Sequence, residues 1–213
     1  GPKCLLQLGG RTLLARHLDA LVSCGVKRAL IVVGYRAEDI YAEVSELSPP
    51  IPVDFVFNKD FLQGPVVSLH LGMKAASRDQ DLLIMDADVL YPRSLLRRLV
   101  KSPHLPCVLL DPSSRQTGEE MMVGVRAEGA RCFVRSIDPE QWDLVGETVG
   151  FLKVGASDIS SLQSAVKEAI AAGGPDQEYE RAYDRLLLSG PFGFERVDDL
   201  PWMEIDFPTD VAK

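Results

Sequence analysis

The sequence predicts an α/β fold in which helices cover both faces of a mostly parallel central sheet, with a small antiparallel extension. In the first half, apolar strand-like runs alternate with amphipathic helical stretches, the pattern of a doubly wound sheet. The run 28–35 contains the continuous apolar, β-branched stretch Ala-Leu-Ile-Val-Val, as in strands covered on both faces. In the second half, strand-like runs follow one another closely, which favours antiparallel pairing.

Each element of the first half has a local signal. Helical spacing of apolar residues predicts three helices, and a proline at the first turn predicts a fourth over 92–101. Gly25 is placed to end the first helix. The predicted helices are 11–26, 36–47, 64–76 and 92–101, and the predicted strands are 28–35, 52–58 and 81–88.

The second half is predicted to contain four closely spaced strands, two helices separated by a Gly-Gly-Pro linker, and a returning stretch. These are the strands 107–111, 121–129, 131–137 and 145–154, the helices 157–172 and 176–188, and the stretch 193–206. There is no internal repeat, and 213 residues with 46% hydrophobic content suit one domain.

Charge and cysteine content narrow the class of protein. The formal net charge of −8 and the pI of about 4.9 argue against a main role in nucleic-acid binding. No apolar run is long enough to cross a membrane and no signal peptide is visible. The four cysteines lack metal-ligand spacing and are interpreted as free thiols of a reducing compartment. We therefore predict a cytoplasmic protein that binds neither nucleic acid nor membranes.

Two carboxylates stand at the end of an apolar strand. Asp86 and Asp88 follow the run Leu-Leu-Ile-Met, and strand alternation would place both on one face, with the small Ala87 opposite. In open α/β sheets, ligands bind beyond the carboxyl ends of strands. Mg²⁺ commonly takes one or two protein carboxylates together with substrate phosphate oxygens. The alternative is that Asp88 caps loop amides.

A second acidic stretch repeats this pattern near the C-terminus. Glu204 and Asp206 alternate with Met203, Ile205 and Phe207, so one face of this strand is apolar and the other carries carboxylates. The alternative is that these acids lie at the start of a helix and interact with its dipole. Two such strand ends in one small fold favour a shared Mg²⁺. Lys3, beside Gly1 and Pro2, is placed to reach phosphates as a point charge.

Several stretches together resemble a known family. Residues 2–40, "DADVLYP" at 86–92, "VGETVGF" at 145–151, "EYE" at 178–180 and "LPWMEIDFPTD" at 200–210 resemble nucleoside-triphosphate transferases of the phosphocholine and 2-aminoethylphosphonate cytidylyltransferase type. The resemblance spans nearly the whole chain. It implies a three-layer nucleotidyltransferase sandwich, similar to A-type glycosyltransferases, as a single domain over residues 1–213, with about 107–200 as the acceptor-facing half.

The resemblance also implies the reaction. CTP would react with a small phosphorylated or phosphonate amine, giving a CDP-linked or CMP-linked product and pyrophosphate by direct in-line attack with Mg²⁺.

Family members normally begin with a strand and a glycine-rich loop, which we expect to precede residue 1. The sequence leaves open whether the protein forms a homodimer. The alternatives are a sugar- or inositol-phosphate nucleotidyltransferase and, in another class, a non-catalytic nucleotide-binding domain.

The resemblance implies a role for each site residue. Lys3, Asp88 and Asp206 would be catalytic, with Asp88 and Asp206 as the Mg²⁺ ligands. The residues implied to bind the nucleotide are Lys3, Asn58, Gln63, Gly64, Ser68 and Asp86.

Carboxylates beside aromatic rings suit a cationic ammonium group. The predicted acceptor-binding residues are Glu147, Glu178, Tyr179, Trp202 and Glu204. Two alternatives are open here: Tyr179 and Tyr183 pack as an ordinary helical pair, and Glu147 only bridges strands. Whether the ammonium is primary or trimethylated is undecided.

Overall fold

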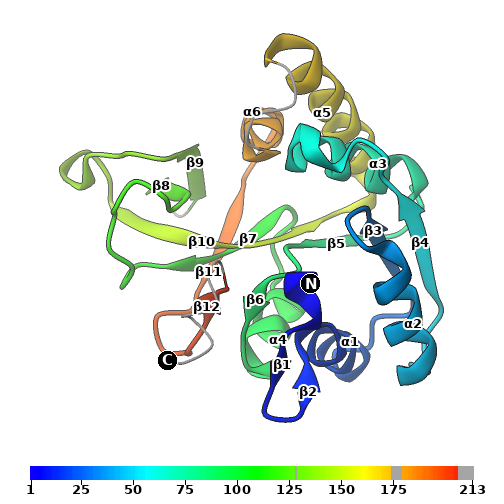
Figure 1. Cartoon of the computed structure of the whole chain (residues 1–213). Helices are drawn as coiled ribbons and strands as arrows, with labels where there is room; N and C mark the ends of the chain where they lie inside the picture. The colour runs from blue at the N-terminus through cyan, green and yellow to red at the C-terminus, as the bar shows by residue number, and fades with distance from the viewer. Residues whose placement is uncertain (128, 174–178, 206–213) are drawn as a thin grey trace.

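A computed structural model describes residues 1–127, 129–173 and 179–205 of the chain. It has the predicted three-layer α/β architecture (Figure 1). Helices α3 (Pro65–Ala75), α5 (Ile159–Gly173) and α6 (Asp184–Ser189) lie on one side of a long central sheet. Helices α1 (Leu13–Ser23) and α4 (Arg93–Lys101) lie on the other side. No helix in the described ranges is both long and apolar enough to span a bilayer.

The central sheet has six described strands in the order β11-β7-β10-β8-β9, and β5 also pairs with β10. These strands are β5 (Leu82–Met85), β7 (Cys107–Asp111), β8 (Met122–Arg126), β9 (Gly129–Val134), β10 (Leu144–Val154) and β11 (Gly193–Arg196). Strand β10 is antiparallel to β5, β7 and β8, whereas β11 is parallel to β7. Therefore β5, β7, β8 and β11 share one direction, and β9 and β10 run the other way.

This topology places two carboxyl ends at the same edge of the sheet. Because β5 and β7 both pair with β10 and run in one direction, Asp111 at the end of β7 lies at the same edge as the residues after β5. The sequence predicted only a small antiparallel extension. Antiparallel pairing instead reaches the centre of the sheet, because β10 lies between β5 and β7. The run 145–154 gave no sign that it would insert between two parallel strands.

Both faces of the central strands are buried, as the continuous apolar runs predicted. On one face, Val108, Leu110, Leu152 and Val154 pack against α3 (Pro65–Ala75), α5 (Ile159–Gly173) and α6 (Asp184–Ser189). On the other face, the alternate residues of β7 and β10 pack against α4 (Arg93–Lys101) and β6 (Val89–Leu90). Each strand therefore contributes to two cores.

The N-terminal part of the chain builds a third core. Parallel strands β3 (Ala29–Val33) and β4 (Val53–Phe57) pack with α1 (Leu13–Ser23) and α2 (Ala37–Leu47). Thr12 caps α1, because its side chain accepts a hydrogen bond from the Ala15 amide at 3.0 Å. Gly25 follows the helix at a φ of +82°, as its position predicted.

Short elements connect these units. They are η1 (Lys3–Leu5), β1 (Gln7–Leu8), β2 (Arg11–Thr12), η2 (Phe61–Gln63), η3 (Pro139–Gln141), η4 (Ala156–Asp158), η5 (Tyr179–Tyr183) and β12 (Met203–Glu204). The helix predicted over 176–188 is, in its described part, the 3-10 turn η5 followed by α6. Within it, the rings of Tyr179 and Tyr183 pack edge to face with centroids 5.9 Å apart. The cysteines are free, as predicted.

A buried histidine joins α1 to the second core. The His17 ring packs edge to face on Tyr91, with centroids 5.1 Å apart, and its Nδ1 lies 3.2 Å from the Tyr91 hydroxyl. Burial lowers the pKa of His17 to about 4, from an ordinary value of 6.5. His17 is therefore a neutral packing residue, and it is 7% exposed.

The free energy of unfolding is expected to fall by about 3 kcal/mol as the pH drops from 7 to 4 on account of His17 alone. The unfolded chain protonates His17 near pH 6.5, whereas the folded chain does so only near pH 4. Protonation therefore favours the unfolded state throughout this window. Urea unfolding of wild type and His17→Phe across the window measures the difference. Parallel pH dependences for the two proteins would show that His17 makes no such contribution.

Candidate active site

The residues after β5 occupy two different environments. Strand β5 ends at Met85 and β6 begins at Val89, so the predicted alternation does not extend through residues 86–88. Both side chains are partly buried, but Asp86 is bound by the Tyr179 hydroxyl whereas Asp88 faces the Lys3 ammonium. The two carboxylates can therefore have different roles.

Asp88 is paired with Lys3. The Lys3 Nζ lies 3.3 Å from Asp88 Oδ2, although 85 residues separate them in the chain. Helix α1 contacts both η1, which carries Lys3, and α4, which follows β6. Both side chains remain partly open to solvent, so the pair contributes little to stability and is available to a ligand.

The second acidic stretch lies against the first. Strand β12 pairs with β6, with Glu204 opposite Val89, and the Ile205 amide donates to the Asp88 carbonyl at 2.9 Å. The backbone that leads to residue 206 therefore runs directly beside Asp88. Asp206, predicted as a metal ligand, and Glu178, predicted to bind the acceptor, lie outside the described residues.

Asp86 is held by contacts from two other elements. The Tyr179 hydroxyl donates to Asp86 Oδ2 at 2.6 Å, and the Asp86 amide donates to the Gly150 carbonyl at 3.2 Å. Gly150 has a φ of +79°, and a Cβ built on it would overlap Asp86 Oδ2. Asp86 therefore ties the end of β5 to β10 and to η5.

The electrostatic environment of Asp86 is acidic. Burial raises the pKa of Asp86 to about 8, and the Tyr179 hydrogen bond offsets only part of this. The neighbouring carboxylates of Asp88, Glu180 and Glu204 raise this pKa further. Such a gathering of carboxylates disfavours additional negative charge and favours a cation.

Carboxylate oxygens are the ligands that Mg²⁺ prefers, and this ion needs few of them when substrate phosphates supply the rest. Within residues 1–127, 129–173 and 179–205, no three His, Cys, Asp or Glu side chains are grouped so that they could hold a metal ion. The partly exposed carboxylate of Asp88 is a hard oxygen donor of the kind that binds a cation together with a phosphate-bearing ligand.

Four of the predicted nucleotide-binding residues lie around the start of α3. Asn58 is 1% exposed, and its Nδ2 donates to Ser68 Oγ at 3.0 Å while its Oδ1 accepts from the Asp60 amide at 2.9 Å. The structure therefore brings Asn58 and Ser68 together, and Asn58 fixes the loop to the helix. Gln63 is exposed and Gly64 is partly buried, immediately before Pro65, the first residue of α3.

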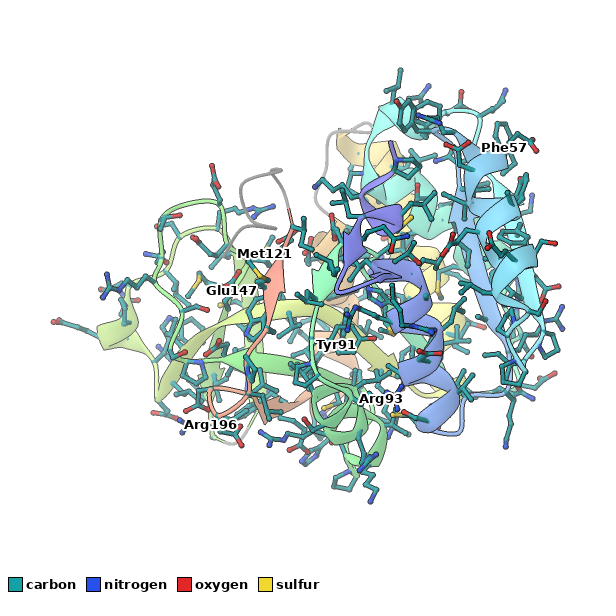
Figure 2. All side chains as sticks on the ribbon, turned by 60° about the horizontal axis from the view of Figure 1, so that its bottom comes forward. Phe57, Tyr91, Arg93, Met121, Glu147 and Arg196 are labelled. Carbon is teal, nitrogen blue, oxygen red and sulfur yellow. The ribbon has the colours of Figure 1, made fainter. Side chains whose placement is uncertain are left out.

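The predicted acceptor residues fall into two groups. Tyr179 and Glu204 belong to the surroundings of Asp86. Trp202 and Glu147 instead gather around Asp111: the Trp202 Nε1 donates to Asp111 Oδ2 at 2.7 Å, and Glu147 is the register partner of Asp111. Figure 2 shows Glu147 beside Met121, whose carbonyl accepts from the Thr148 amide.

Sequence reasoning missed Asp111. Its signal was present, because Asp111 follows four apolar residues of β7 just as Asp86 follows four apolar residues of β5. Burial raises the pKa of nearby Glu147, with Glu120 and Asp111 adding to the shift and Ser114 and Arg135 opposing it.

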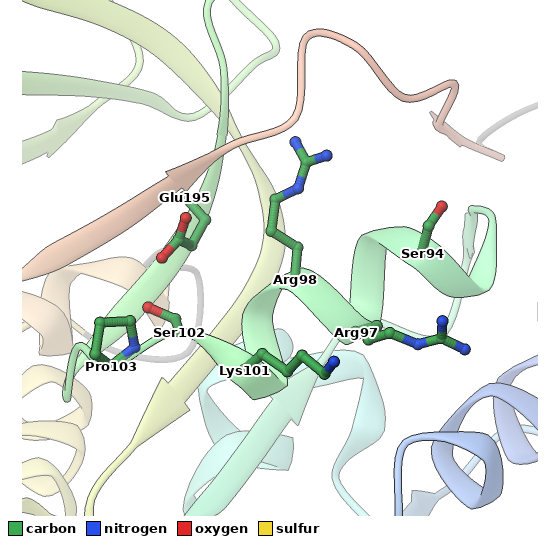
Figure 3. Close-up of a pocket in the computed structure, with 7 residues that line it drawn as sticks. All are labelled: Ser94, Arg97, Arg98, Lys101, Ser102, Pro103 and Glu195. Carbon is green, nitrogen blue, oxygen red and sulfur yellow. The ribbon is translucent and has the colours of Figure 1, made fainter.

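A shallow groove of about 370 Å³ lies along α4 (Figure 3), and none of the predicted site residues lines it. It is lined by Ser94, Arg97, Arg98, Lys101, Ser102, Pro103 and Glu195. Arg98 is bound to both carboxylate oxygens of Asp199. The groove is an open surface with its charges partly matched, and we assign it no catalytic role.

A three-layer α/β sandwich with acidic residues and a lysine at the carboxyl end of a central strand defines the nucleotidyltransferase class. Residues 1–140 match the MobA-like NTP transferase domain family, and the chain belongs to that family. The nucleoside-triphosphate transferase resemblance of the sequence is thereby confirmed.

Relatives and solved structures of similar fold extend over the whole chain. The chain is 24% identical to the CMP-5'-(3-aminopropyl)phosphonate synthase of Streptomyces rubellomurinus (strain ATCC 31215), covering 98% of this chain and 34% of the relative. It is also 24% identical to the bifunctional IPC transferase and DIPP synthase of Thermococcus kodakarensis (strain ATCC BAA-918 / JCM 12380 / KOD1), covering 100% and 45%. It thus spans less than half the length of these curated relatives.

Among solved structures, the CTP:phosphocholine cytidylyltransferase of Streptococcus pneumoniae superposes with a TM-score of 0.77 at 18% identity, covering 99% of this chain and 87% of that one. The inositol-1-phosphate CTP transferase of T. maritima gives a TM-score of 0.76 at 18% identity, covering 99% and 82%. At this identity, the likeness establishes the fold.

Proposed function

We propose that the protein is a Mg²⁺-dependent cytidylyltransferase that joins CTP to a small phosphorylated or phosphonate amine and releases pyrophosphate. The observation that carries the proposal is the pairing of Lys3 with Asp88 at the carboxyl end of β5, beside the backbone of Ile205. The relatives and neighbours named above add support, since their names include CTP, a CMP-phosphonate product and phosphocholine.

The proposed reaction is a direct displacement. An oxygen of the acceptor's phosphate or phosphonate attacks the α-phosphorus of CTP, a new P–O bond forms, and the bond to pyrophosphate breaks. Both reactants are anions, so catalysis depends on positioning and on neutralising charge. No covalent nucleophile of the protein is required.

The chain's own residues have distinct tasks in this proposal. Lys3 neutralises charge on the attacked phosphate and on the departing pyrophosphate. Asp88 and Asp206 would hold Mg²⁺, which when bound withdraws charge from the phosphate oxygens. Asp86 fixes the end of β5 through Tyr179 and Gly150. Gln63, Gly64 and the first amides of α3 face the anionic nucleotide.

The acceptor-facing half, about residues 107–200, would supply the pocket for the amine. Trp202 and Glu147, gathered around Asp111, combine an aromatic ring with a carboxylate. Such a combination attracts an ammonium group and repels a second anion.

The test is an assay of pyrophosphate release with CTP, UTP, GTP and ATP, each against phosphocholine, 2-aminoethylphosphonate, a sugar 1-phosphate and inositol 1-phosphate. We expect release with CTP and an amine-bearing acceptor. Release only with a sugar or inositol phosphate would support the second candidate, which the inositol-phosphate relatives favour. Nucleotide binding without release for any pair would favour a non-catalytic domain.

A further inference from the structure

We propose that Asp111 is a specificity-determining positioning residue: it locks the Trp202 indole into the wall of the pocket that receives the acceptor's ammonium group. This inference rests on the proposed function and names the residue that makes the pocket selective for a cation.

Asp111 is itself rigidly held. It is 8% exposed at the end of β7, and its Oδ1 accepts from the Ser113 amide at 2.8 Å and from the Ser113 hydroxyl at 2.6 Å. Its Oδ2 accepts from the Trp202 indole at 2.7 Å. A carboxylate has about four lone-pair sites, and protein donors occupy three of them. Asp111 therefore acts through Trp202 and has little capacity to bind an ammonium directly.

The hydrogen bond fixes a ring that would otherwise be free to turn. Trp202 is partly exposed, and its apolar neighbours belong to the core formed by α4, β6, β7 and β10. Apolar packing alone is not directional, whereas the indole N–H can meet Asp111 Oδ2 in only a narrow range of ring orientations. Asp111 therefore sets the orientation of the Trp202 ring in the wall of the proposed pocket.

Trp202 lies close in the chain to the proposed reaction centre. It is three residues before Ile205, whose amide donates to the Asp88 carbonyl at 2.9 Å. Three residues span at most about 10 Å of backbone, so the backbones of Trp202 and Ile205 lie within that distance of each other. Trp202 therefore belongs to the same short segment of chain that runs beside Asp88.

Glu147 gives the same pocket its charge. It lies directly opposite Asp111 in the antiparallel ladder between β10 and β7, so both side chains project from the same face. Like charges at opposed positions are unfavourable, and a bound cation relieves this repulsion. An ammonium placed on Trp202 would be within the field of both carboxylates.

The experiment compares two acceptors that differ only in charge: 2-aminoethylphosphonate and 2-hydroxyethylphosphonate. The kcat/KM for each is measured at saturating CTP in wild type, Asp111→Asn and Trp202→Phe. The last variant keeps an aromatic ring and lacks the N–H donor. Asp198→Asn is the matched control, because Asp198 lies between β11 and β12, as Trp202 does, and pairs with exposed Arg196.

We expect the preference for the amine to fall about tenfold in Asp111→Asn and in Trp202→Phe, through a higher KM for the amine. The KM for CTP and the kcat/KM for the hydroxyl analogue should stay at wild-type values, which a general structural defect would not allow. Asp198→Asn should retain the wild-type preference. If Asp111→Asn fails to fold, Trp202→Phe carries the test.

An unchanged preference in folded Asp111→Asn and Trp202→Phe would overturn this inference and leave the proposed function standing. A wild-type enzyme that accepts only sugar or inositol phosphates would overturn both.

Discussion

Asp88→Asn is expected to lower turnover by a factor on the order of 10³ while the protein keeps its fold. The substitution removes one carboxylate charge from the proposed Mg²⁺ site and leaves Lys3 without its charged partner. Because the Lys3–Asp88 pair is partly exposed, its loss should change the melting temperature little. Steady-state pyrophosphate release and a thermal melt measure the two effects separately.

Asp19→Asn is the matched control for this prediction. Asp19 also makes a partly exposed ion pair, with Arg11, but is not among the proposed site residues. It should retain wild-type turnover. An Asp88→Asn protein that turns over at the wild-type rate would remove Asp88 from the catalytic machinery.

Gly150→Ala is expected to reduce the free energy of unfolding by about 2–4 kcal/mol and to impair turnover. An alanine would strain the backbone at a φ of +79°, and its Cβ would overlap Asp86 Oδ2. The displaced Asp86 would lose its fixed position under the Tyr179 hydroxyl. Urea unfolding and pyrophosphate release give the two readouts.

Gly25→Ala separates the two causes of this loss. Gly25 has a φ of +82°, and a Cβ there would have no atom within 4 Å, so this variant reports backbone strain alone. The extra loss in Gly150→Ala should disappear in an Asp86→Ala background, since the overlapping carboxylate is then absent. If Gly25→Ala and Gly150→Ala reduced the free energy of unfolding equally, the overlap with Asp86 would make no contribution to the loss.

The fold was predictable because its signals are local and repeated. The continuous apolar runs of β3, β5 and β7 indicated strands buried on both faces. Helical spacing of apolar residues marked α1, α2 and α3, and a proline at the first turn marked α4. The insertion of β10 between β5 and β7 was not predictable. Pairing order depends on contacts between residues distant in the chain, and no local pattern in residues 145–154 encodes it.

The candidate site was predictable where a residue type was unusual for its setting. Asp86 and Asp88 stood out at the end of an apolar strand, and the structure places Lys3 on Asp88. The different environments of the two aspartates were not predictable, because alternation fails where β5 ends at Met85. Tyr179 was assigned to the acceptor for its ring, whereas its hydroxyl is bound to Asp86. Asp111 carried the same strand-end signal and was overlooked.

A structure determined with CTP and Mg²⁺ tests the central claim most directly. We predict one ion between the triphosphate and the carboxylates of Asp88 and Asp206, with metal–oxygen distances of about 2.1 Å. Lys3 should then contact phosphate oxygens. An ion bound elsewhere, with Asp88 still engaged only by Lys3, would contradict the proposal.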